Sequence, residues 1–267
     1  MARYQQMFER LKQQQQIAFI PFVMLGDPNL ETSFEIIKTL IESGADALEL
    51  GIPFSDPVAD GPTIQEASIR ALANSVTPAQ CFSLLEKIRE FSKDIPIGLL
   101  VYSNLVYRNG IENFYQRCQA AQVDSVLIAD VPLRETELFD RHAKRADIAP
   151  VHILPPNPSE QTLMQVAKRS CGYTYILGRA GVTGTETSAQ MPAQQTLQSL
   201  RDYQAAPQVM GFGISQPTQV QQAKAAGFEG VISGSAVVKI IAENLADKPE
   251  MLARLADFIQ RMKAATT

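Results

Sequence analysis

The sequence predicts an α/β protein, a (β/α)8 TIM barrel that forms a single domain over residues 1–267 with an extra N-terminal helix. Two observations lead to this prediction. Eight short apolar segments alternate with helical patterns, and strands that alternate with helices form parallel sheets. The length of 267 residues also suits a closed eight-unit barrel, which typically takes about 250 residues. A doubly wound open sheet is the alternative architecture.

The predicted strands follow a weak internal repeat. In residues 43–50, 121–128 and 226–233 a helix ends, the chain turns, an acidic residue follows, and an apolar strand begins. Gly44 and Gly227 stand where a helix needs a left-handed cap, which glycine adopts without strain. The eight segments that contain strands are 18–25, 43–50, 95–102, 121–128, 148–154, 173–177, 208–212 and 226–233.

Helices are predicted between these strands. A short amphipathic helix occupies the first sixteen residues, before the first strand. Thr77 and Pro78 begin a helix with a capping box, and Ser215 begins another helix with a proline two residues later. Two apolar stripes mark the first and last barrel helices: Leu30, Phe34, Ile37 and Ile41, and Leu252, Leu255, Phe258 and Met262.

The composition excludes several classes of protein. The net charge is −4 and the basic residues are scattered, so no basic stripe suggests nucleic acid. The longest apolar run, residues 17–25, contains Pro21 and is too short to span a bilayer. The N-terminus lacks the apolar core of a signal peptide. We therefore expect a cytoplasmic protein that binds neither nucleic acid nor membranes.

The cysteines and histidines predict no metal site. Cys81, Cys118 and Cys171 are odd in number and far apart, which fits a reducing compartment. His142 and His152 have no Cys or His companion at ligand spacing. We expect no bound metal.

An acidic side chain on an apolar strand is the first candidate for catalysis. Alternation along the strand puts Leu48 and Leu50 on one face and Glu49 on the other. Asp60 follows in an acidic, proline-rich loop. Two carboxylates held apart by a structured loop suit general acid–base chemistry on a neutral organic substrate. A glutamate bonded to backbone amides and an aspartate that starts a turn or helix are the plainer interpretations.

Glycine-rich loops predict a phosphate site. They follow the last three strands, at residues 178–184, 211–213 and 233–235, and Ser235 then begins a helix. Glycine lets backbone N–H groups approach a dianion, and a helix N-terminus adds partial positive charge. In barrels, phosphate commonly binds to the loops after strands seven and eight. Each loop alone is explained by a simple turn. No P-loop lysine follows, and residues 211–213 lack the third glycine of a dinucleotide fingerprint, so no nicotinamide cofactor is expected.

The chain resembles the tryptophan synthase alpha subunit family over essentially its whole length. The motifs that carry the resemblance are PFVMLGDP (21–28), ELGIPFSDPVADGPTIQ (49–65), GRAGVTG (178–184), GFGIS (211–215) and VISGSAVV (231–238). The resemblance implies a TIM barrel that cleaves indole-3-glycerol phosphate into indole and glyceraldehyde 3-phosphate without a cofactor. It also implies that the indole passes to a beta subunit for L-tryptophan synthesis.

The resemblance further implies a role for individual residues. Glu49 and Asp60 become the catalytic pair. The cleaved bond joins indole C3 to the glycerol chain, so C3 must first be protonated. We assign Glu49 the proton transfer, because burial raises the pKa of a carboxyl group, and Asp60 the stabilisation of the ring N–H. The implied substrate-binding residues are Phe22, Leu100, Leu127, Tyr175, Phe212 and Ile232 around the indole, Gly184, Gly213, Gly234 and Ser235 at the phosphate, and also Ile64 and Thr183.

Residues 179–191 form a long, polar segment with glycine hinges, which predicts a lid over the active site. Within this segment, Thr183 can bond Asp60 and so hold the lid closed. An ordinary surface loop is the alternative.

A partner surface is predicted next to the same end of the barrel. Leu105, Val106 and Tyr107 follow the third strand and are expected to be exposed in a loop. The resemblance implies that this face, with residues 53–60, docks on a pyridoxal-phosphate-dependent beta subunit in an α2β2 tetramer. The alternatives are a stand-alone indole-3-glycerol-phosphate lyase, another phosphate-binding barrel such as an isomerase, and a non-catalytic regulatory subunit.

Overall fold

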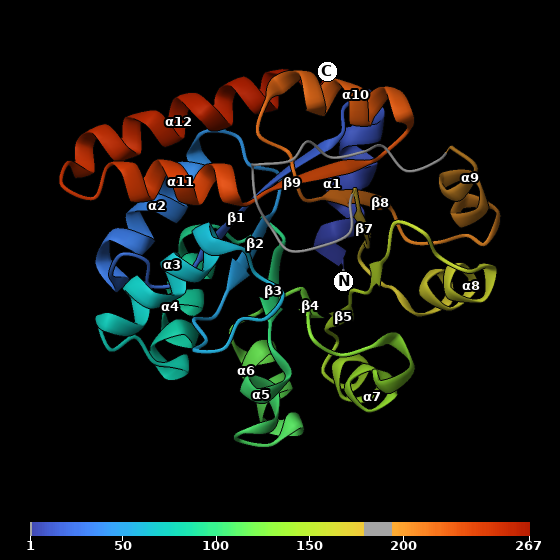
Figure 1. Ribbon diagram of the computed structural model, residues 1–267, viewed down its shortest axis with the longest axis horizontal. Helices are drawn as coiled ribbons and strands as arrows, with labels where there is room; N and C mark the ends of the chain where they lie inside the picture. Colours follow the sequence, from blue (N-terminus) through green and yellow to red (C-terminus); the bar gives the residue numbers. More distant parts are fainter. Residues whose placement is uncertain (1, 179–193) are drawn as a thin grey trace.

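Parallel strands form the centre of the molecule and helices surround them (Figure 1). The computed structural model describes residues 2–178 and 194–267. The strands are β1 (Ala18–Met24), β2 (Leu48–Gly51), β3 (Ile97–Val101), β4 (Ser125–Ile128), β5 (Ala149–Pro150), β6 (Ile153–Leu154), β7 (Thr174–Leu177), β8 (Gln208–Gly211) and β9 (Gly230–Ser233).

The sheet closes on itself through one interrupted strand. The strand order is β5-β4-β3-β2-β1-β9-β8-β7-β6, and β5 and β6 are consecutive pieces of the chain. Between them, the Val151 N–H donates to the Val126 carbonyl of β4 at 3.0 Å, and the His152 carbonyl accepts from the Tyr175 N–H of β7 at 3.2 Å. This segment therefore joins both edges, and the barrel has eight strand positions, as predicted.

The interruption differs from the single strand predicted over residues 148–154. Ala149 donates to Asp124, just before β4, and Val151 donates to Val126 in β4, so alternation directs the nitrogen of Pro150 toward β7. Proline has no N–H, which removes one ladder hydrogen bond at this point.

Helices cover the outside of the barrel, and most follow a strand. The helices are α1 (Ala2–Gln13), α2 (Leu30–Glu42), α3 (Pro62–Ala73), α4 (Pro78–Phe91), α5 (Ser103–Tyr107), α6 (Ile111–Ala120), the 3₁₀ turn η1 (Leu133–Glu135), α7 (Glu137–Arg145), α8 (Glu160–Arg169), α9 (Gln194–Asp202), α10 (Pro217–Ala226), α11 (Ser235–Glu243) and α12 (Lys248–Ala264). Within the described ranges, none is long and apolar enough to cross a membrane.

Most of the predicted helix ends are confirmed. Thr77 caps α4 with a capping box, and Gly44 and Gly227 have φ values of 107° and 97°. The start of α10 is one residue later than predicted: Gln216, not Ser215, is the N-cap. The N–H groups of Ser215 and Gln216 donate to the Gln219 side chain at 2.8 Å and 2.9 Å, so this glutamine fixes the backbone just before the helix.

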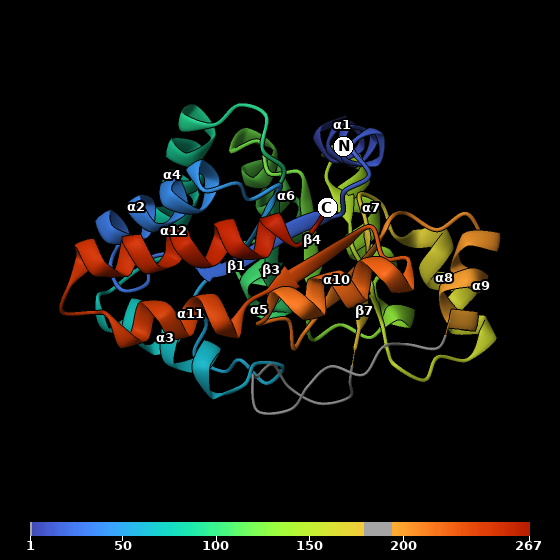
Figure 2. The ribbon, with the colours of Figure 1, turned by 90° about the horizontal axis from the view of Figure 1, so that it is seen from above.

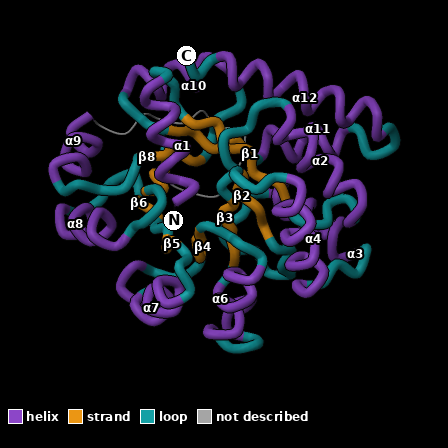
Figure 3. The backbone as a smooth tube through the Cα atoms, turned by 180° about the vertical axis from the view of Figure 1, so that it is seen from behind, coloured by secondary structure: helices purple, strands orange, loops and turns teal. Residues whose placement is uncertain are grey.

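The predicted N-terminal helix closes the end of the barrel at which the strands begin (Figures 2 and 3). The hydroxyl of Tyr4 in α1 lies 3.0 Å from the Ser125 hydroxyl at the start of β4, and the Tyr4 ring contacts Tyr173 with a centroid distance of 5.5 Å. A Cβ at Gly98 would lie 2.9 Å from the Tyr4 hydroxyl, so this strand position must be glycine for Tyr4 to enter.

The two faces of β2 separate the core from the site. Leu48 and Leu50 pack outward in the cluster between the barrel and its helices. Glu49 points inward and lines the cavity at the opposite end of the barrel from α1. The alternation predicted for this strand is confirmed.

Candidate active site

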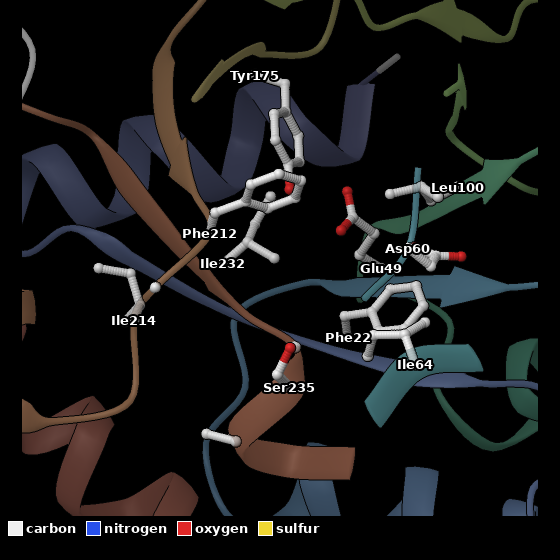
Figure 4. A pocket seen from close by; sticks show the side chains of 13 residues that line it. Phe22, Glu49, Asp60, Ile64, Leu100, Tyr175, Phe212, Ile214, Ile232 and Ser235 are labelled. Carbon is white, nitrogen blue, oxygen red and sulfur yellow. The ribbon is translucent and has the colours of Figure 1, made fainter. Parts of the chain in front are cut away.

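A pocket opens at the carboxyl ends of the strands (Figure 4). Most of the predicted substrate-binding residues line it together with both acids. The lining residues are Phe22, Glu49, Asp60, Ile64, Leu100, Tyr175, Phe212, Gly213, Ile214, Ile232, Gly234, Ser235 and Ala236.

Glu49 is a buried acid held by one hydrogen bond. Glu49 is 2% exposed, and the Tyr173 hydroxyl donates to its Oε1 at 3.0 Å. Burial raises the pKa of Glu49 to about 8, the nearby Asp60 charge raises it further, and the bond from Tyr173 acts in the opposite direction. At neutral pH Glu49 therefore carries a proton that it can donate.

Asp60 is the second buried acid and stands just before α3. It is 5% exposed, and the Tyr102 hydroxyl donates to its Oδ2 at 2.9 Å. Burial raises the pKa of Asp60 to about 6, against the opposing effect of the Tyr102 bond. At neutral pH Asp60 is therefore mostly ionised, and the two acids are in opposite protonation states on the same pocket wall (Figure 4).

The walls between the acids and the pocket mouth are aromatic and aliphatic. The rings of Tyr175 and Phe212 meet edge to face, with centroids 6.1 Å apart. A Cβ at Gly211 would lie 2.1 Å from the Tyr175 ring, so only glycine leaves room for the tyrosine there. Phe212 has a φ of 73°, a left-handed conformation that costs a non-glycine residue energy. The flat apolar space that results suits a planar aromatic ring.

The opposite part of the pocket suits an anion. It is lined by Gly213, which has a φ of 74°, and by the start of α11 at Gly234, Ser235 and Ala236. The first N–H groups of a helix have no partner within the helix and point along its positive end. The described lining contains no lysine or arginine, so backbone amides and the helix dipole supply the attraction for a phosphate.

Three predicted residues are not in the lining. Leu127 is buried beside the pocket, in the inner core cluster that also contains Phe22 and Tyr175. Thr183 and Gly184 lie outside the described residues, as does the predicted lid, 179–191.

Four residues of the site were not predicted. Ile214 and Ala236 line the pocket because they directly follow the predicted residues Gly213 and Ser235. Tyr102 and Tyr173 each donate to one of the acids without lining the pocket. A tyrosine at a strand end fits β-propensity alone, so the sequence carries no signal for either contact.

The predicted partner surface needs a correction. Leu105, Val106 and Tyr107 form the short helix α5 rather than a loop, Val106 is fully buried, and Leu105 packs against the core. The helix turns these two side chains inward, and of the three only Tyr107 is exposed, by 52%. Val58, in the loop before Asp60, is 74% exposed at the same end of the barrel.

Comparison with known sequences gives one consistent family. A family model described as "Tryptophan synthase alpha chain" matches residues 8–267. The tryptophan synthase alpha chain of Francisella tularensis (strain WY96-3418) is 60% identical over 264 residues, covering 99% of this chain and 98% of the relative. The alpha chain of Serratia proteamaculans (strain 568) is 57% identical over 266 residues, covering 100% of this chain and 99% of the relative.

Comparison with solved structures agrees with the sequence matches. Mycobacterium tuberculosis tryptophan synthase gives a TM-score of 0.88 at 25% identity, over 98% of this chain and 97% of that one. A structure of the tryptophan synthase α2β2 complex from Pyrococcus furiosus gives a TM-score of 0.81 at 31% identity, over 92% of this chain and 98% of that one.

Proposed function

The chain belongs to the tryptophan synthase alpha chain family, and on this basis we propose that Glu49 and Asp60 act together in its active site. The reaction is the cleavage of indole-3-glycerol phosphate into indole and glyceraldehyde 3-phosphate. One observation carries the assignment: two buried acids in opposite protonation states share a wall of a pocket whose far end is a helix N-terminus.

Glu49 acts first as an acid and then as a base. Its proton goes to indole C3, which turns the ring into an indolenine with positive charge at its nitrogen. The bond between C3 and the glycerol carbon then breaks, and its electrons return to the ring. The Glu49 carboxylate takes the hydroxyl proton of that carbon as the aldehyde forms. The proton count balances, and Glu49 ends protonated as it began.

Asp60 stabilises the charge that develops on the ring. An ionised carboxylate facing the indolenine N–H favours the protonated intermediate over the neutral substrate, which lowers the barrier. The raised pKa of about 6 still leaves Asp60 mostly ionised at neutral pH.

The pocket walls orient the substrate for these steps. The indole lies among the apolar walls, which include Phe22, Tyr175 and Phe212, with its C3 toward Glu49. Its phosphate lies near Gly213 and the start of α11. Thr183 and Gly184 complete this set in our proposal, as lid and phosphate contacts respectively.

A beta subunit is the proposed partner. The tryptophan synthase of Pyrococcus furiosus is an α2β2 complex with mutual activation. The exposed Val58 and Tyr107, at the same end of the barrel as the pocket, support docking at this face. We further propose a single-domain chain located in the cytoplasm. The unpaired thiols of Cys81, Cys118 and Cys171 are in keeping with a reducing compartment.

An assay of indole release tests the function directly. The purified chain is incubated with indole-3-glycerol phosphate, alone and with a beta subunit. We expect indole in both mixtures and faster release with the partner. High turnover that the partner does not increase would indicate a stand-alone lyase. Absence of indole in both mixtures refutes the proposed reaction.

A further inference from the structure

We propose that Tyr102, which does not line the pocket, is a positioning residue that holds Asp60 and its loop in the working arrangement. The inference deepens the proposed function and rests on it. Tyr102 follows β3, whereas Asp60 follows β2, so the contact joins two neighbouring units of the barrel.

The Tyr102 side chain contacts the loop before α3 at three points. The Tyr102 hydroxyl donates to Asp60 Oδ2 at 2.9 Å and accepts from the Ala59 N–H at 3.1 Å. Its ring stacks on Phe54, with centroids 5.2 Å apart and an interplanar angle of 23°. The hydroxyl uses both its donor and an acceptor position, so the orientation of the Asp60 carboxylate and the path of the backbone before it are fixed together.

The rest of the loop has few such restraints. Ser55, Asp56 and Val58 are exposed, whereas Tyr102 is 3% exposed. The middle of the loop is therefore exposed, whereas its two ends, at Phe54 and Asp60, are held by Tyr102. Without this contact, the Asp60 carboxylate loses the hydrogen bond that orients it and favours its ionised form.

Tyr102 is itself held in place, so it can act as a fixed support. The next residue, Ser103, donates through its N–H and its hydroxyl to the two carboxylate oxygens of Asp130, both at 2.8 Å. Asp130 follows β4, so the support reaches the next barrel unit as well.

The bond from Tyr102 also favours the ionised form of Asp60. The hydroxyl stabilises the carboxylate and opposes the rise in the pKa of Asp60 that burial causes. The other titratable groups around this pair are Glu49 and Tyr175, which face Asp60 from within the barrel, and Asp130, which affects Tyr102. In the described part of the chain none of these three groups donates a hydrogen bond to Asp60, so Tyr102 is the contact to remove.

The test is the pH profile of kcat/KM for indole release by full-length Tyr102→Phe, from pH 5 to 9. Activity requires ionised Asp60, so it falls as the pH drops through the pKa of Asp60. Loss of the hydroxyl raises that pKa, and we expect the acid limb to move upward by about one pH unit. The decline of kcat/KM at high pH depends on the pKa of Glu49, so this basic limb should not move. At the acid limb kcat/KM falls about tenfold, and it recovers toward the native value near pH 8.

Matched variants separate positioning from general damage. Tyr203→Phe removes a hydroxyl that bonds Glu160 on the outer surface, and its profile should match the native one. The substrate phosphate titrates near pH ~6, but identically for every variant. Phe54→Leu keeps the Tyr102 hydroxyl and weakens the ring contact, so we expect a smaller shift of the same limb.

Three results overturn the inference. The first is a folded Tyr102→Phe variant whose activity falls at the same acid pH as in the native chain. The second is an equal loss of activity at every pH in that variant. If Tyr102→Phe does not fold, the third is a Phe54→Leu variant whose acid limb does not move. Each leaves the proposed function intact if the native chain releases indole. A native chain that releases none, with or without a beta subunit, refutes the proposed function instead.

Discussion

The chemistry of individual residues depends on how little water reaches the acids. A carboxylic acid in water is ionised at neutral pH, but burial raises the pKa of Glu49 to about 8. The same burial would neutralise Asp60 as well if nothing opposed it. The difference between the two acids follows from the deeper burial of Glu49 and from its position beside a charge of the same sign.

Glu49→Gln tests the proton-transfer role. The amide keeps the size of the side chain and can still accept from Tyr173, but it has no acidic proton. We expect turnover to fall by at least ~10³ while substrate binding persists, measured by steady-state kinetics and calorimetry. Near-normal turnover of this variant removes Glu49 from the mechanism.

The same variant should be more stable than the native chain above neutral pH. The folded chain raises the pKa of Glu49, so its contribution destabilises the fold increasingly as the pH rises from about 4.5 toward about 8. A neutral glutamine does not have this cost. We expect a gain of ~1–3 kcal/mol in unfolding free energy at pH 8, and little difference at pH 4, from urea titrations.

Tyr173→Phe should move the basic limb of the pH profile. Its hydroxyl lowers the pKa of Glu49, so its loss raises that pKa further. Activity requires protonated Glu49 and declines as the pH rises through this pKa, so the basic limb of kcat/KM should shift upward by about one pH unit. A downward shift contradicts the assigned direction of proton transfer.

At the scale of secondary-structure elements, the helix α3 fixes the position of Asp60. The helix begins two residues after the acid, and the Gln65 side chain donates to the Asp60 carbonyl at 2.7 Å. Farther along α3, Arg70 donates from Nε and Nη2 to the two oxygens of Asp27, both at 2.8 Å. This bidentate pair anchors α3 to the loop after β1, and the Asp27 side chain is only 1% exposed.

Arg70→Met should therefore be costly. It leaves a buried carboxylate without its partner, and we expect the unfolding free energy to fall by ~3 kcal/mol. Arg254→Met is the matched control, because Arg254 pairs with Glu250 on the surface of α12, where such pairs contribute little to stability. Chemical denaturation of both variants checks the contrast, and similar losses in the two rule out an anchoring role for Arg70.

Local sequence patterns predict most of the secondary-structure elements but not the contacts between distant ones. All eight strand positions were predicted, because apolar runs and helix caps are local signals. The break at residues 151–152 and the inward faces of Leu105 and Val106 were not predicted, since they depend on neighbours distant in the chain. The contacts of Tyr102 and Tyr173 with the acids are of the same kind. Each joins residues from different barrel units, which no local pattern reveals.

At the scale of the whole molecule, a helix outside the eight units completes the barrel. Tyr4, Met7 and Leu11 of α1 are buried at the end where the strands begin. Tyr4→Ala removes a ring that contacts Tyr173, and the space cannot refill easily because strands surround it. We expect a loss of ~3–5 kcal/mol in unfolding free energy. Gln5→Ala, at an exposed position of the same helix, should change it by less than ~0.5 kcal/mol, and equal losses would contradict the role of Tyr4 as a plug.

The packing of Tyr4 at this end has a consequence for how substrate enters and products leave. Tyr4 and Tyr173 fill the floor of the barrel beneath Glu49, so the described part of the pocket opens at the carboxyl ends of the strands. In our proposal the substrate enters and the products leave through this opening. A protein seated over it would therefore control both the arrival of substrate and the departure of products.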